Sequence, residues 1–92
     1  MDGKVIDNPA ERRFEMAVGD ELAVSYYNIE DQRIVLLHTE VPQHLSGQGV
    51  GSQLARGVFE MIRGRGQRVI AKCPFMSAYA SRHREYSSLL DG

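Results

Sequence analysis

Residues 41–52, which read VPQHLSGQGVGS, decide the fold. Pro42 ends a run of apolar and β-branched residues, because proline cannot donate to a strand ladder. Three alternating glycines follow, and from Val50 apolar residues recur at helical spacing. A strand that leads through glycines into a helix leaves free N–H groups at the helix start, where the helix dipole favours an anion. The segment therefore predicts a phosphate or pyrophosphate site, with a ligand-free glycine loop as the alternative.

Three strands are expected before this segment. Residues 13–18 alternate apolar and polar, and Gly19-Asp20 suits a two-residue hairpin turn. Residues 21–26 form the second expected strand, followed by a polar turn at 30–32. Residues 34–41 form the third, and their apolar run favours a central position with both faces covered. Residues 1–11 are polar and are expected to form a loose or edge segment.

After the glycines, the pattern predicts a helix that begins at Val50 and ends near Gly64. Residues 68–73 form a fourth strand, and residues 75–83 a second helix. The crossover helix makes the third and fourth strands parallel if they are neighbours. The predicted class is α/β (α+β): a mixed, mostly antiparallel sheet of about four strands, with a central helix after the glycine-rich loop and a second, C-terminal helix.

Composition places the chain among ordinary globular proteins. Its 92 residues fit a single domain, residues 1–92, and 42% apolar with 25% charged residues argues against a disordered chain. The one cysteine, Cys73, excludes a disulfide scaffold. No apolar stretch is long enough to span a bilayer, and the N-terminus lacks the apolar core of a signal peptide. We therefore expect a cytoplasmic protein with no membrane partner.

Charge is distributed unevenly. The net charge is −1, yet residues 1–45 carry nine acids and four bases, whereas residues 46–92 carry three acids and seven bases. The basic half could face phosphates of a nucleotide or of a nucleic acid, and a solvated basic surface is the alternative. Because no aromatic–basic platform or nucleic-acid motif accompanies it, we expect no nucleic-acid partner.

The glycine loop fits neither of two common phosphate-binding motifs. Gly51-Ser52-Gln53 lacks the lysine of a P-loop, and the glycine spacing is not that of a Rossmann fold. The sequence instead resembles the GNAT superfamily of N-acetyltransferases, in a compact single-domain subgroup. The resemblance covers residues 12–90 and is carried by His38-Thr39-Glu40-Val41-Pro42, by residues 47–52 and by Cys73-Pro74-Phe75.

Within that resemblance, Gly49 and Gly51 match the two small positions of the family's phosphate loop. Ser46 departs from the Arg or Gln preferred there, and Gln48 is the candidate for the missing contact. The family implies that acetyl-coenzyme A (acetyl-CoA) is the cofactor, with its pantetheine arm beside the third strand and its pyrophosphate on the loop. The cofactor-binding residues implied are Thr39, Val41, Gly47, Gln48, Gly49, Val50, Gly51 and Ser52.

The resemblance further implies transfer of an acetyl group to a primary amine by direct attack, where the third and fourth strands diverge. His38 and Cys73 are candidate catalytic residues because both could reach that opening. Histidine can exchange protons near neutral pH, and Cys73 stands at a helix start, where the dipole favours negative charge. The alternatives are a core histidine and an inert buried thiol.

Tyr79 is the third catalytic candidate, because in the family a tyrosine on the equivalent helix protonates the departing thiolate. Core packing is the alternative for Tyr79. Cys73 either lines the acetyl site or forms a transient acetyl-cysteine. His44 and His83 lack the spacing of metal ligands, so we expect no metal site.

Two other functions stay open. A non-catalytic acyl-CoA-binding module would keep the glycine loop but lack a productive base, and the small size of the chain favours it. A nucleic-acid-binding domain would use the basic half. For an enzyme, the acceptor would be a small-molecule amine or a protein lysine or N-terminus, and the protein would be a monomer or a homodimer.

Overall fold

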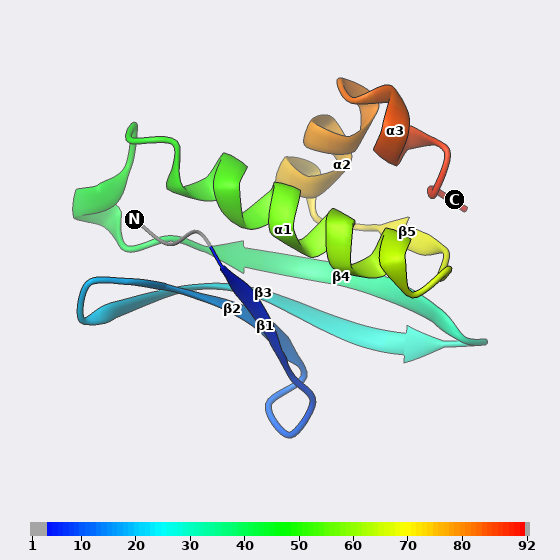
Figure 1. The fold of residues 1–92 in the computed structure, drawn as a ribbon, viewed down its shortest axis with the longest axis horizontal. Helices are drawn as coiled ribbons and strands as arrows, with labels where there is room; N and C mark the ends of the chain where they lie inside the picture. Colours follow the sequence, from blue (N-terminus) through cyan, green and yellow to red (C-terminus); the bar gives the residue numbers. More distant parts are fainter. Residues whose placement is uncertain (1–3, 92) are drawn as a thin grey trace.

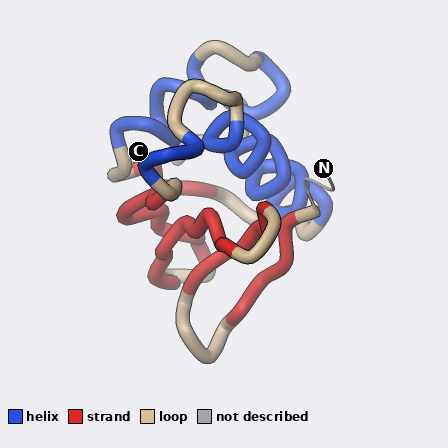
Figure 2. Tube along the Cα trace, turned by 90° about the vertical axis from the view of Figure 1, so that its left-hand side faces the viewer, coloured by secondary structure: helices blue, strands red, loops and turns tan. Residues whose placement is uncertain are grey.

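The computed structural model describes residues 4–91 and arranges them in two layers (Figure 1). The helices lie on one side of a single sheet (Figure 2). The sheet holds five strands in chain order: β1 (Val5–Asn8), β2 (Arg13–Val18), β3 (Glu21–Glu30), β4 (Arg33–Glu40) and β5 (Val69–Ala71). The helices are η1 (Gln43–Leu45), α1 (Val50–Gly64), α2 (Pro74–Ser81) and α3 (Arg84–Ser87). None of these helices is long and apolar enough to cross a lipid bilayer.

The predicted fold class is confirmed. Strands β1 to β4 pair in antiparallel fashion, and β4 pairs with β5 in parallel across the crossover helix α1. The sheet has five strands rather than four, because residues 5–8 of the expected loose or edge segment pair with β2; residues 1–3 lie outside the described residues. The last strand is shorter than predicted, and it ends at Ala71 rather than at Cys73.

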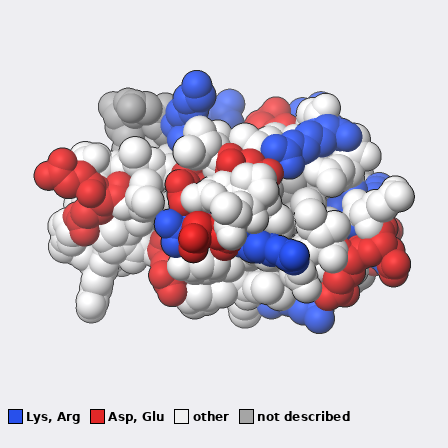
Figure 3. Space-filling view, turned by 90° about the horizontal axis from the view of Figure 1, so that it is seen from below, with Lys and Arg blue, Asp and Glu red and all other residues white. Residues whose placement is uncertain are grey.

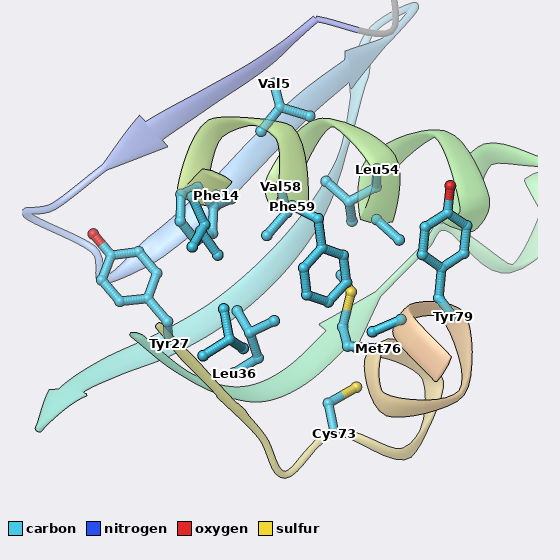
Figure 4. Packing of buried hydrophobic residues seen from close by; sticks show 14 of the residues in the cluster. Val5, Phe14, Tyr27, Leu36, Leu54, Val58, Phe59, Cys73, Met76 and Tyr79 are labelled. Atoms are coloured by element: carbon cyan, nitrogen blue, oxygen red, sulfur yellow. The ribbon is translucent and has the colours of Figure 1, made fainter. Parts of the chain in front are cut away.

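The core lies between the sheet and α1. Phe14 and Phe59 are fully buried there, and Phe14 packs against Tyr27 with ring centroids 4.8 Å apart (Figure 4). The ring of Phe59 also stacks on Tyr79 of α2 and Tyr86 of α3, at centroid distances of 6.2 and 5.4 Å. Removing a buried aromatic ring of this kind costs about 3–5 kcal/mol. Because Phe59 of α1 contacts rings from both α2 and α3, it packs all three α-helices into one aromatic cluster.

Strand β4 contains a bulge at Leu37. Tyr27 pairs with Leu36 and Tyr26 pairs with His38, so Leu37 has no partner on β3. An extra residue reverses the face to which the following side chains point. Leu37 is 45% exposed on the helix-free face, so the expectation that both faces of this strand are covered is wrong at this residue.

The edge strand β1 is held by Asp7. Its carboxylate accepts a hydrogen bond of 2.6 Å from the Tyr27 hydroxyl and pairs with Arg65 at 2.9 Å. Burial, followed by the hydrogen bond to Asp7, raises the pKa of Tyr27 to about 12. The folded protein thus keeps the Tyr27 proton at a pH where an unfolded chain has lost it.

Tyr27→Phe should make stability less sensitive to alkaline pH. In the wild type, the free energy of unfolding should fall as the pH rises from 10.0 to about 12, because unfolded Tyr27 ionises before folded Tyr27. The variant loses this contribution, and at pH 7 it loses about 1 kcal/mol with the hydrogen bond. Urea unfolding followed by circular dichroism measures both effects, and equal slopes in this window would contradict the assignment.

Candidate functional site

The loop before α1 presents unpaired backbone donors. Gly49 is the N-cap of α1, and it adopts φ +80°, a left-handed conformation that disfavours other residues. No side chain caps the helix, and the first bond into it runs from the Gln53 N–H to the Gly49 carbonyl. Among residues 4–91, no acceptor meets the N–H groups of residues 50–52. These groups can therefore bind an anion.

A groove runs from this loop toward the end of β4. Its outer part is a cavity of about 360 Å³ lined by Val41, Leu45, Ser46, Gly47, Gly49, Val50, Gly51, Ser52 and Phe75. Its inner part is a cavity of about 210 Å³ lined by Thr39, Val41, Gly51 and Phe75. The two cavities share three residues, so a single elongated ligand could occupy both.

At its inner end, the groove meets the point where β4 and β5 diverge. The Leu36 carbonyl accepts hydrogen bonds from the N–H groups of Lys72 and Cys73, at 2.9 and 3.0 Å. Beyond this point β4 continues to Glu40, whereas the chain after β5 turns into α2 at Pro74. Thr39 Oγ1 lies 3.3 Å from Cys73 Sγ and forms a hydrogen bond with it. Thr39 and Cys73 are thus the polar side chains that meet at the divergence.

His38 and Cys73 do not reach one opening. His38 stacks on Tyr26, with ring centroids 6.4 Å apart, and its Nε2 pairs with Glu40 Oε2 at 3.2 Å. Tyr26 points to the helix-free face, since its neighbour Tyr27 is in the core. This corrects the expectation that the two candidates share a site. The physical reason is the bulge at Leu37, which turns His38 away from Cys73 and Thr39 toward it.

His38 lines a different cavity, of about 570 Å³, around the ends of β3 and β4. Thr39 and Val41 line this cavity as well as the groove, so β4 separates the two spaces. Two histidine–glutamate pairs stand at its rim: His38 with Glu40, and His44 Nε2 with Glu21 Oε1 at 2.7 Å. The cavity therefore offers carboxylates and imidazoles next to the inner end of the groove.

Tyr79 lies in the core of the helical layer. Its ring stacks on His83 with centroids 4.1 Å apart, and in Figure 4 it extends toward α1 with its hydroxyl far from the Cys73 sulfur. Burial raises the pKa of Tyr79, and the nearby Arg56 opposes this shift more weakly. Tyr79 lines neither cavity of the groove. The structure thus does not bring Tyr79 together with Cys73.

The remaining candidates lie at the surface. Ser46 is exposed in the loop, and the Gln48 side chain donates to the His44 carbonyl at 3.5 Å. Within residues 4–91, no three His, Cys, Asp or Glu side chains gather closely enough to hold a metal ion.

A larger cavity, of about 800 Å³, lies at the other end of α1. Its three arginines pair with aspartates: Arg33 and Arg68 with Asp91, at 3.2 and 3.3 Å, and Arg65 with Asp7 at 2.9 Å. These positive charges are already neutralised, so the cavity is a weaker anion site than the loop.

Sequence reasoning did not single out Phe75 as a functional residue, although it lines both parts of the groove. Its only sequence signal was its place in Cys73-Pro74-Phe75. Because large apolar residues are most often buried, nothing in the sequence placed this ring at the groove.

Comparison with known proteins gives a matching family model and a similar solved structure. The family model described as GCN5-related N-acetyl-transferase matches residues 13–89. The solution NMR structure of a GCN5-like protein from Staphylococcus aureus, itself a candidate N-acetyltransferase, superimposes with a TM-score of 0.71. The two sequences are 27% identical, and the match covers 100% of this chain and 92% of that one. No curated protein matches the chain.

The glycines at the two ends of α1 provide a matched test of the loop. Gly49→Ala should destabilise the protein by about 1–2 kcal/mol, because alanine is strained in the left-handed conformation. Gly64 is helical and has open space where a Cβ would stand, so Gly64→Ala should stabilise the protein by up to about 1 kcal/mol. Urea unfolding of both variants measures these effects. A Gly49→Ala protein as stable as the wild type would contradict the left-handed cap.

Proposed function

The chain belongs to the GCN5-related N-acetyltransferase family, and on that premise we propose that it transfers an acetyl group from acetyl-CoA to a primary amine by direct attack. One observation carries the proposal. Unpaired N–H groups at the start of α1 open on a groove that ends where Thr39 meets Cys73. An anion site joined to a narrow groove fits a cofactor with a pyrophosphate and a long arm.

The residues present fit acetyl-CoA. The N–H groups of Val50, Gly51 and Ser52 would hold the pyrophosphate, aided by the helix dipole. The loop residues Gly47, Gln48 and Gly49 would bring the backbone close to it. On the side of β4 that faces α2, none of residues 4–91 pairs with the strand beyond Leu36. The arm amides would hydrogen bond there beside Thr39 and Val41, like an added strand.

When bound, acetyl-CoA supplies the acetyl group and a thiolate leaving group, which would take up the proton that the amine loses on acylation. The acceptor amine must be neutral to attack, and we assign His38, paired with Glu40, to accept the first proton in the cavity on its side of β4, before the amine reaches the groove. Thr39 lines the inner end of the groove and its hydroxyl contacts the Cys73 thiol, so this pair would orient the thioester. We assign Tyr79 to packing, because it stacks between helices and lines neither part of the groove.

The acceptor side carries negative charge. Glu21 and Glu40 line the cavity beside His38, and carboxylates there would attract a cationic amine before it loses its proton. A protein lysine, a protein N-terminus or a small amine would all fit this chemistry.

The second candidate function is a non-catalytic acyl-CoA-binding module. The exposure of His38 favours it, because the imidazole is separated from Cys73 by the strand itself. A nucleic-acid partner has less support, since the helix-free face intersperses acidic and basic side chains (Figure 3).

Binding of CoA should depend on the N–H groups of the first turn. Ser52→Pro removes one unpaired donor without breaking an intrahelical hydrogen bond, whereas Ser52→Ala keeps that donor. We expect the proline variant to bind CoA about tenfold more weakly, since a hydrogen bond to a charged group contributes about 1.5–3 kcal/mol. The alanine variant should bind like the wild type in calorimetry. Equal affinities for all three proteins would rule out the loop as the pyrophosphate site.

Transfer itself is tested with labelled acetyl-CoA and a panel of amines: lysine peptides, free N-termini and polyamines. Turnover that falls strongly in His38→Ala, with CoA affinity unchanged, supports the enzyme. Tight CoA binding with no transfer to any amine would favour the binding module instead.

Cys73 should line the site without carrying the acetyl group. Incubation with acetyl-CoA alone should add no acetyl mass to the intact protein, because attack on the thioester needs an accessible thiolate and Cys73 is only 4% exposed. Cys73→Ser should lower turnover modestly, through changed packing beside Thr39. An acetylated Cys73 that passes its acetyl group to an amine would overturn direct attack.

A further inference from the structure

Phe75 stands at the junction of the two parts of the groove. It is the second residue of α2, and its large apolar side chain is 39% exposed. The ring lines both the cavity over the loop and the cavity beside Thr39. A ligand that reaches from the loop to Thr39 must therefore pass this ring.

The ring tip rests on the first turn of α1. Phe75 Cζ lies 3.0 Å from the point where a Cβ on Gly51 would stand, and Cε2 lies 3.5 Å from it. Gly51 lies within α1 and has no positive φ, unlike Gly49, so its backbone conformation does not require glycine. A side chain at position 51 would instead meet the Phe75 ring. Gly51 and Phe75 thus form a pair, although they are 24 residues apart in the sequence.

We propose that Phe75, seated on Gly51, is the positioning residue for the arm of CoA, and that this pair lets the protein select CoA over nucleotides that lack the arm. The inference rests on the proposed function and adds a residue to it. The aliphatic part of the arm would cover the exposed ring and bury apolar surface on both partners. The pyrophosphate would be held by the backbone N–H groups of the loop. The Phe75 ring has no polar group to offer it and contributes only apolar surface to the groove.

Two ligands separate the role of the ring from that of the loop. CoA has both pyrophosphate and arm, whereas adenosine 3′-phosphate 5′-diphosphate keeps the pyrophosphate and lacks the arm. Phe75→Ala should weaken CoA binding roughly tenfold, the scale expected for the loss of one apolar contact surface, and leave the armless nucleotide unchanged. Phe75→Leu, which keeps apolar volume, should recover part of the CoA affinity. Ile29→Ala, a control at the exposed side chain near the other end of α1, should change neither affinity.

Gly51→Ala tests the contact between Gly51 and the Phe75 ring. Its Cβ would displace the ring rather than the helix, because Cζ is the tip of a partly exposed side chain. We expect weaker CoA binding, and no further loss when Gly51→Ala is added to Phe75→Ala. This non-additivity is what two residues in contact should show.

Calorimetry supplies the affinities, and thermal unfolding without ligand checks that each variant is folded. If Phe75→Ala weakens both ligands equally, the ring acts through the loop and the proposal is wrong. Independent, additive losses of CoA affinity would also overturn it. A wild type that binds neither ligand would overturn the proposed function itself, an outcome distinct from both of these.

Discussion

The site depends on one carbonyl group. The Leu36 carbonyl accepts the last two hydrogen bonds from the β5 side, and the next residue, Leu37, is the bulge. Two constraints coincide there: β4 loses its register with β3, and β5 ends because Pro74 cannot donate to a ladder. The strands must then separate. The groove, the contact of Thr39 with Cys73 and the exposed ring of Phe75 all follow from this separation.

A second requirement is that α2 stays in place after β5 ends, since α2 carries Phe75 and is capped by Cys73. Stacked aromatic side chains hold α2 against α1. Tyr79 stacks on Phe59 of α1, and Tyr86 of α3 stacks on the same ring while its hydroxyl donates to Glu60 at 2.6 Å. Stacked rings of this kind contribute about 0.5–1.5 kcal/mol beyond the area that they bury. The packing of the helical layer therefore determines how wide the groove is.

The sequence was sufficient to predict the strands and α-helices from β2 to α2 in their order, the parallel pairing across α1 and the glycine loop, because each rests on a local signal. The bulge has no such signal, since an extra leucine in the run 34–37 looks like one more core residue. Without the bulge, His38 would lie on the same face of the sheet as Leu36 and point toward Cys73. The one inserted residue places His38 on the opposite face. The contact of Phe75 with Gly51 could not be predicted from the sequence either. It joins two helices, and glycine spacing alone suggested that Gly51 served only the backbone.

The order of the strands bears on how the chain folds and opens. Strands β1 to β4 pair only with their neighbours in sequence, so each hairpin closes a short loop at a small cost in chain entropy. Strand β5 is different: a whole helix separates it from β4, and only three residue pairs join the two strands. Among the strands, β5 is thus the last expected to form and the first expected to exchange its amide protons with solvent. The edge of the sheet beside the groove is therefore less stable than the four antiparallel strands, and its amide protons should report local opening there before global unfolding.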